Sequence, residues 1–214
     1  MKIKIEGFNK IIKGYLVLDN INLTLESGQI YGLFGENGSG KTMLLRAICG
    51  LLKPTSGIIE IDNRTLGKDM DFPESIGAII ENPEFFDDFT GYQNLKRLAN
   101  IKKIIGDTEI HNVLTKVGLD PNDRRSVRKY SLGMKKRLSI AQAIMESPQI
   151  LLLDEPTNAL DEAGIQMFQN IMNEEKEKGT LIIIASHNKE DILDLVEHKI
   201  YLNYGAICPE RNKL

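Results

Sequence analysis

Cysteine and long apolar segments are both scarce in this sequence of 214 residues. The two cysteines, Cys49 and Cys208, lack metal-type spacing, which fits a reducing cytosol better than a disulfide scaffold. No apolar run approaches the roughly 18 residues that a membrane helix needs. The longest runs, 150–153 and 181–185, have the length of strands. The first six residues alternate charged and apolar side chains, which predicts a strand and excludes a signal peptide.

An excess of basic charge is also missing. The chain carries 27 Lys and Arg against 30 Asp and Glu, a formal net charge of −3. Such a balance gives no general attraction to nucleic acid or to anionic lipid. Hydrophobic residues make up 42% of the chain, enough to bury a core and exclude general disorder. The length predicts one domain, or one core with a subdomain.

Alternating strand and helix patterns predict an α/β fold with a largely parallel sheet. Strand patterns begin the chain, and a mostly helical insert is expected over 85–148. We expect a single domain over 1–214, with a core at about 1–84 and 149–214. The expected strands are 1–25, 30–34, 57–62, 150–153, 181–185 and 200–207, and the expected helices are 42–49, 165–172 and 192–196.

A glycine-rich segment follows the expected strand 30–34 and precedes a helix. It reads Gly35, Glu36, Asn37, Gly38, Ser39, Gly40, Lys41 and Thr42, and so fits the phosphate-loop pattern G-x-x-x-x-G-K-[ST]. Glycines allow the backbone N–H groups to point at phosphate oxygens, and the helix dipole favours the same charge. Lys41 is expected to reach the β- and γ-phosphates and Thr42 to bind Mg²⁺. The loop alone does not distinguish a kinase, a GTPase and an ATPase.

Two carboxylates end the apolar strand 150–153. Asp154 is placed to hold Mg²⁺, and Glu155, which points to the other side of the strand, can act as general base on a water molecule. His187 follows the strand 181–185 and is a candidate to contact a γ-phosphate. Asp161 is expected to cap the next helix.

These motifs and a further sequence string, at 130–135, resemble those of the ATP-binding cassette (ABC) ATPases, and the resemblance covers essentially the whole chain. The string 130–135, Tyr-Ser-Leu-Gly-Met-Lys, looks like a variant of that family's signature. The resemblance implies a phosphate-loop nucleotide-hydrolase core with an antiparallel N-terminal β subdomain and a helical subdomain. It implies ATP and Mg²⁺ as ligands, with Lys41, Glu155 and His187 as catalytic residues.

The resemblance also implies partners. Two copies, or a pair of related cassettes, would pack head to tail around two ATP molecules, each ATP contacting Ser131 and Gly133 of the opposite copy. A separate membrane permease would carry the cargo, so the expected location is the cytoplasm, at the inner face of the cell membrane. No nucleic-acid partner is expected.

Two departures from the family pattern stand out. Glu81 occupies the place of the glutamine that senses Mg²⁺, and it can still bind the metal. The adenine-stacking aromatic is expected near Ile12, where Tyr15 is the nearest ring. The string 76–86, with Glu81, and the later string 131–135 together resemble the bacitracin- and lantibiotic-type export and immunity cassettes, which implies a peptide or antibiotic-like cargo. Phe85 and Phe86, at the end of the string 76–86, are either an exposed docking pair for the permease or core residues.

A basic run over 124–129 continues at Lys135, Lys136 and Arg137, and we interpret it as a solvated surface. Three other functions remain as alternatives to a transporter subunit. They are a non-transport ABC ATPase acting on ribosomes or DNA, a small-molecule kinase, and a catalytically inactive interaction module. The compact single cassette argues against the ribosome- or DNA-associated ATPase. The signature string argues against the kinase, and the intact catalytic residues argue against the inactive module.

Overall fold

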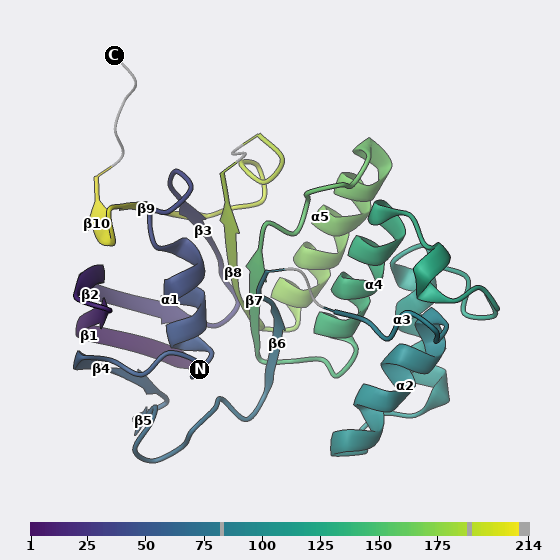
Figure 1. Ribbon diagram of the computed structural model, residues 1–214, viewed down its shortest axis with the longest axis horizontal. Helices are drawn as coiled ribbons and strands as arrows, with labels where there is room; N and C mark the ends of the chain where they lie inside the picture. The colour runs from purple at the N-terminus through teal and green to yellow at the C-terminus, as the bar shows by residue number, and fades with distance from the viewer. Residues whose placement is uncertain (82–83, 188–189, 210–214) are drawn as a thin grey trace.

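The computed structural model describes residues 1–81, 84–187 and 190–209, and it contains two β-sheets (Figure 1). The smaller, antiparallel sheet has the order β2-β1-β4-β5. Its strands are β1 (Lys2–Ile12), β2 (Tyr15–Glu26), β4 (Ser56–Ile61) and β5 (Arg64–Thr65). Ile3 and Ile5 are buried while Lys2 and Lys4 are exposed, because alternate residues of a strand face opposite sides.

The larger sheet has six strands in the order β10-β9-β3-β8-β7-β6. All its pairings are parallel except that of β9 with β10. Three of its strands, 30–34, 150–154 and 181–186, are buried along their whole length because helices or the second sheet cover both faces. The strands are β3 (Ile30–Phe34), β6 (Ile76–Ile79), β7 (Ile150–Asp154), β8 (Leu181–Ser186), β9 (His198–Asn203) and β10 (Ala206–Cys208).

Most of the helical structure lies between β6 and β7 in the sequence, as expected for 85–148. Within the described part of the chain, no helix is long and apolar enough to cross a bilayer. The helices are α1 (Lys41–Ile48), α2 (Gly91–Lys102), α3 (Asp107–Lys116), the short 3₁₀ helix η1 (Val127–Lys129), α4 (Leu132–Ile144) and α5 (Glu162–Glu177).

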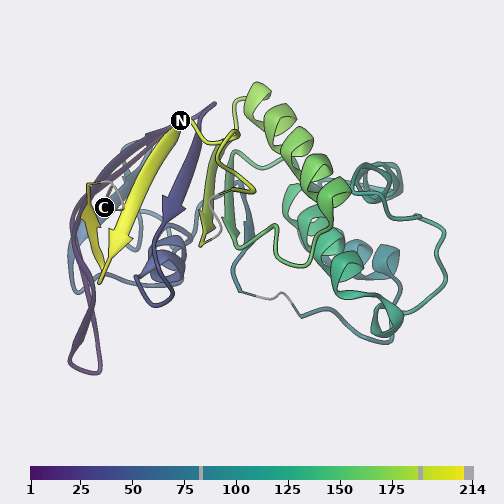
Figure 2. The same cartoon turned by 90° about the horizontal axis from the view of Figure 1, so that it is seen from above.

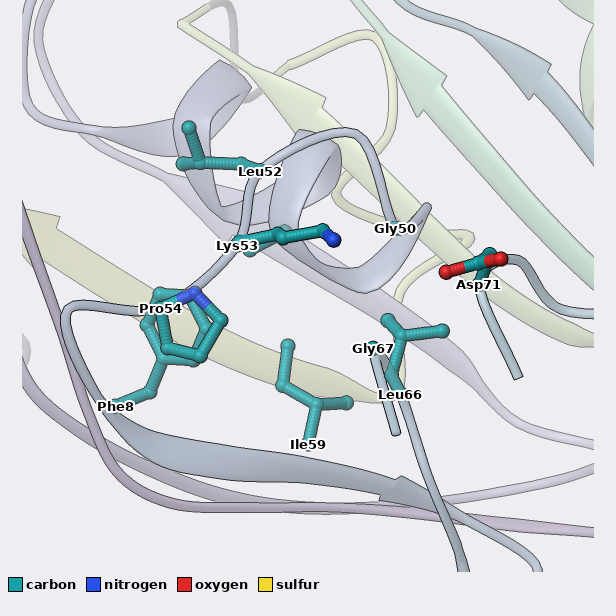
Figure 3. A pocket seen from close by; sticks show the side chains of 10 residues that line it. Phe8, Gly50, Leu52, Lys53, Pro54, Ile59, Leu66, Gly67 and Asp71 are labelled. Atoms are coloured by element: carbon teal, nitrogen blue, oxygen red, sulfur yellow. The ribbon is translucent and has the colours of Figure 1, made fainter. Parts of the chain in front are cut away.

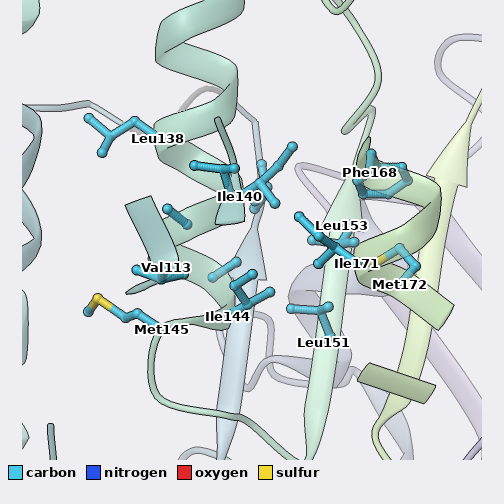
Figure 4. Close-up of a cluster of buried hydrophobic side chains, with 14 of the residues drawn as sticks. Val113, Leu138, Ile140, Ile144, Met145, Leu151, Leu153, Phe168, Ile171 and Met172 are labelled. Atoms are coloured by element: carbon cyan, nitrogen blue, oxygen red, sulfur yellow. The ribbon is translucent and has the colours of Figure 1, made fainter. Parts of the chain in front are cut away.

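Helices α1 and α4 cover opposite faces of the larger sheet (Figures 1 and 2). Leu151 and Leu153 of β7 share an apolar cluster with Ile144 of α4 and Ile171 of α5 (Figure 4). Ile150 and Leu152, the alternate residues, belong to a second cluster that contains α1 and the smaller sheet. The phosphate-loop helix and the signature helix are therefore separated by the sheet within one chain.

The structure differs from the sequence-based expectation at 192–196, at β6 and at the two-residue strand β5. The expected helix at 192–196 is wrong, because it is a single turn with Ile192 O accepting from Leu195 N and Val196 N. Glu197 N donates to Ile30 O directly before β9 begins at His198, so the chain joins the sheet immediately after this turn. Strand β6 was not expected, because Gly77 and Ala78 have low strand propensity.

Candidate functional site

The phosphate-loop segment connects β3 to α1 as a tight turn. Gly38 and Gly40 have φ values of 81° and 107°, a left-handed backbone that glycine adopts most readily. A Cβ on Gly35 would lie 2.4 Å from Leu202 O and 2.5 Å from Ser39 Oγ. The glycines are therefore required for the compact path of this loop.

Lys41 lies inside the loop that precedes it. It is only 6% exposed, and its Nζ donates to Gly35 O at 2.7 Å and Glu36 O at 3.1 Å. Burial lowers the pKa of the Lys41 ammonium, while the carboxylates of Glu155 and Asp154 raise it. Ser39 Oγ is buried and has no hydrogen-bond partner among the described residues. The orphaned hydroxyl, the ammonium and the free N–H groups of the first turn of α1 fit a polyphosphate.

Thr42 and Asp154 meet at the end of β7. Thr42 Oγ1 donates to Asp154 Oδ2 at 2.6 Å. Burial raises the pKa of the Asp154 carboxyl, and the Thr42 hydrogen bond opposes that rise. A hydroxyl and a carboxylate are hard oxygen ligands of the kind that Mg²⁺ prefers. Phosphate oxygens and water would supply the remaining ligands of the ion. The described residues contain no group of three or more Asp, Glu, His or Cys that could hold a metal by themselves.

The Glu155 side chain is held at the end of β8. Its Oε1 lies 2.7 Å from His187 Nδ1 and accepts from the His187 backbone N–H at 3.0 Å, and its Oε2 accepts from Ser186 Oγ at 3.3 Å. Glu155 has a φ of 49°, an uncommon conformation for a residue with a side chain. Such backbone strain concentrates at functional positions. His187 is thus paired with Glu155, and two of the three predicted catalytic residues are brought together.

Glu81 is engaged by a residue that the sequence analysis did not single out. Arg46 Nη2 of α1 donates to Glu81 Oε1 at 2.7 Å. Glu81 lines the same groove as Asp154 and Glu155 and also has a left-handed φ, 62°. Asn82 and Pro83, which belong to the string that indicated the export subgroup, lie outside the described residues.

Ser131 and Gly133 lie at the start of α4. Ser131 is the N-cap, and its Oγ accepts from Met134 N at 3.2 Å. A Cβ on Gly133 would lie 3.0 Å from Ala159 O, so this end of α4 packs closely on the segment after β7. Both residues line a second hollow with Asp161, which caps α5 as expected by accepting from Gly164 N. That hollow contains none of the phosphate-loop residues.

The interpretation of the basic run as a solvated surface is correct for Arg124, Arg125, Arg128 and Lys129, which are exposed. It is wrong for Lys136, which is 8% exposed and donates from Nζ to the Glu155 backbone O at 3.1 Å. The burial of Lys136 could not be predicted from a run of basic residues. It depends on which face of α4 is turned toward the end of β7.

The remaining predicted residues are peripheral. Ile12 and Tyr15 pair across the β1–β2 hairpin, and Tyr15 is 76% exposed. Phe86 is exposed, whereas Phe85 packs against the larger core cluster, so the two rings do not form one exposed pair.

A separate small hollow lies between the end of α1 and the antiparallel sheet (Figure 3). Apolar side chains such as Phe8, Ile59 and Leu66 dominate its walls. It contains none of the predicted site residues, so the groove at the end of β7 remains the functional candidate.

Comparison with known proteins identifies the family. The family model described as ABC transporter matches residues 18–158, well over half of the chain. The chain belongs to the ABC transporter family. It is an ABC ATP-binding subunit, an ATPase, and the resemblance inferred from the sequence is confirmed, as is the α/β class. The non-transport alternative is not favoured.

Named relatives include bacterial transport subunits. The chain is 51% identical to the uncharacterized ABC transporter ATP-binding protein YybJ of Bacillus subtilis, covering 96% of this chain and 94% of the relative. It is 39% identical to the bacitracin transport ATP-binding protein BcrA of Bacillus licheniformis (97% and 69% covered). It is 38% identical to the lantibiotic transport ATP-binding protein SrtF of Streptococcus pyogenes (98% and 90% covered).

A solved structure shares the whole architecture. The dimeric structure of MJ0796, a bacterial ABC transporter cassette, superposes with a TM-score of 0.86 at 25% identity over 97% of each chain. MJ0796 has also been solved as a dimer in a post-hydrolysis state bound to ADP and phosphate.

Proposed function

We propose that two copies of this cassette, or this cassette and a related one, close around two ATP molecules, each held between one copy's phosphate loop and the other's signature. The observation that carries the proposal is the placement of α1 and α4 on opposite faces of the sheet. A single chain therefore offers the Ser131–Gly133 hollow to a nucleotide held elsewhere. The dimeric neighbours support the same arrangement.

The residue roles follow from the chemistry of each group. Residues 35–42 hold the phosphates, with the Lys41 ammonium against the β- and γ-phosphate oxygens. Glu155 accepts a proton from the attacking water, and His187, already hydrogen-bonded to Glu155, steadies the γ-phosphate. Ser131 and Gly133 contribute the N-terminal end of α4 to the opposite nucleotide.

Thr42, Asp154 and Glu81 would hold Mg²⁺. When bound, the ion neutralises charge on the phosphate oxygens. In this structure Glu81 Oε1 accepts from the Arg46 guanidinium, so Arg46 competes with the ion for the charge of this carboxylate.

The cassette works, in this proposal, with a separately encoded membrane permease at the inner face of the cell membrane. The relatives named for bacitracin and lantibiotic transport support export of a peptide or antibiotic-like compound. Residues 85–148 would form a helical subdomain on a core made of 1–84 and 149–214, within one nucleotide-binding domain.

The test is the association state of Glu155→Gln with Mg-ATP, measured by size exclusion with light scattering. The variant keeps the shape of the side chain and loses the base, so ATP is retained and a stable dimer is expected. Glu162→Gln, at an exposed position of α5, is the matched control and is expected to hydrolyse ATP and return to monomer. A Glu155→Gln protein that stays monomeric at saturating Mg-ATP contradicts the proposal.

A further inference from the structure

Lys136 is a buried cation with no role in the site as described so far. It lies in the second turn of α4 and is 8% exposed. Its neighbours differ: Lys135 reaches out to Asp87, and Arg137 donates to Val117 O and Asp161. Lysine is rarely buried unless paired, because the ammonium loses its hydration.

The Lys136 ammonium faces the acidic end of β7. Its Nζ donates to the backbone O of Glu155 at 3.1 Å, and the side chain lines one groove with Asp154 and Glu155. Burial lowers the pKa of Lys136, and the carboxylates of Glu155 and Asp154 raise it, so the cation is partly compensated there.

This hydrogen bond completes the immobilisation of Glu155. The Glu155 backbone N–H donates to Ala185 O at 2.9 Å, and the carboxylate is held by Ser186 and His187. The carbonyl is the remaining polar group of the residue, and Lys136 holds it from the other side. A left-handed residue at a strand end needs such supports, because this backbone conformation is higher in free energy than the extended one for a residue with a Cβ.

We propose that Lys136 is a positioning residue that fixes the backbone of Glu155 to helix α4, so that the placement of the general base depends on the helix that carries the signature. The inference rests on the proposed function for the role of Glu155. Ser131 and Gly133 lie at the start of the same helix, α4. A nucleotide that contacts Ser131 and Gly133 from the opposite copy would therefore influence the position of Glu155 through α4 and Lys136.

If Lys136 only stabilised the fold, its replacement would have different consequences from those expected of a positioning residue. Lys136 forms no ion pair within 4 Å among the described residues, and its Nζ donates to a backbone carbonyl. An apolar side chain of similar length therefore removes the cost of burying the ammonium without leaving a carboxylate partner unpaired. If Lys136 serves catalysis at some cost in stability, Lys136→Met will keep or gain thermal stability and lose turnover. If Lys136 serves only the fold, Lys136→Met will lose stability, and the surviving protein will keep its turnover.

The experiment compares Lys136→Met, Lys136→Gln and the wild-type protein. For Lys136→Met we expect kcat to fall about tenfold or more, since a charge-assisted hydrogen bond is lost. KM for ATP should stay within about twofold of wild type, because the phosphate loop is untouched. Lys136→Gln retains an N–H donor and should recover part of kcat. Amide hydrogen exchange of the nucleotide-free protein should be faster at residues 155–161 in Lys136→Met.

Lys116→Met is the matched control. Lys116 is one of two lysines, with Lys178, that pair with the buried Glu175, and neither Lys116 nor Glu175 lines the groove. Loss of Lys116 should therefore lower the melting temperature and leave kcat unchanged. A kcat for Lys136→Met within about twofold of wild type overturns the inference. Failure of the proposed function is distinguishable, because it would show in the Glu155→Gln protein as the absence of an ATP-dependent dimer.

Discussion

Gly77 sets the distance between β6 and the signature helix. A Cβ at Gly77 would lie 1.8 Å from Ala143 O, near the end of α4, and 3.0 Å from Pro148 Cγ. Cβ atoms essentially never approach a backbone atom closer than 3.0 Å, so Gly77→Ala forces α4 and β6 apart by at least about 1.2 Å. The backbone of Gly77 does not require glycine, since its φ is not positive, and the substitution isolates this steric effect.

The magnitude follows from overpacking. Forcing extra atoms into a packed core costs about 1–3 kcal/mol. For a chain of this size each kcal/mol lowers the melting temperature by about 2–4 °C. Gly77→Ala is therefore expected to melt about 2–12 °C below wild type by calorimetry. ATPase activity should also fall, because α4 carries Ser131 and Lys136.

The control is Gly106→Ala. A Cβ there would meet only Glu109 Oε2, at 3.4 Å, and Gly106 sits at the N-cap of α3. Its loss of stability should stay below about 1 kcal/mol. If Gly77→Ala melts as close to wild type as Gly106→Ala does, the close contact between α4 and β6 described above is refuted.

Two further substitutions test the charges of the site. Because burial raises the pKa of Asp154, the folded apo protein binds that proton more tightly than the unfolded chain, so the ionised form costs stability at neutral pH. Asp154→Asn should raise the melting temperature of the apo protein at neutral pH, and this gain should vanish as the pH falls through the raised pKa of Asp154. A gain that grows at acid pH contradicts the raised pKa. Arg46→Gln should change the free energy of unfolding by less than about 1 kcal/mol, because the pair is partly solvated. It should also lower the Mg²⁺ concentration that gives half-maximal ATPase activity, and an unchanged Mg²⁺ titration would count against competition for Glu81.

The parts of the site that the sequence predicted are local in the chain. The phosphate loop is one contiguous string, and its glycines follow from turn geometry, as Gly38 and Gly40 show. Asp154 and Glu155 follow from an apolar strand that ends in carboxylates. Sheet topology then brings the ends of β3, β7 and β8 to one edge, which is why Thr42 meets Asp154 and Glu155 meets His187.

The missed features depend on packing between distant segments. The Arg46–Glu81 pair joins residues of opposite charge that no local pattern links. Lys136 was hidden within a run of basic residues, and its burial is decided by how α4 docks on the sheet. Strand β6 is held by parallel pairing with β7 and by the close approach of α4. Neither contact can be predicted from the local sequence around Gly77 and Ala78.

The most direct test of the shared nucleotide site is complementation between two inactive variants. Lys41→Ala removes the loop cation, and Ser131→Arg blocks the start of α4, so each homodimer should be inactive at both sites. In a mixed dimer, the intact loop of the Ser131→Arg chain faces the intact signature of the Lys41→Ala chain. We predict that mixing the two proteins restores ATPase activity well above the sum of the separate proteins. Activity no greater than that sum, in a mixture shown by light scattering to form mixed dimers, would contradict the account.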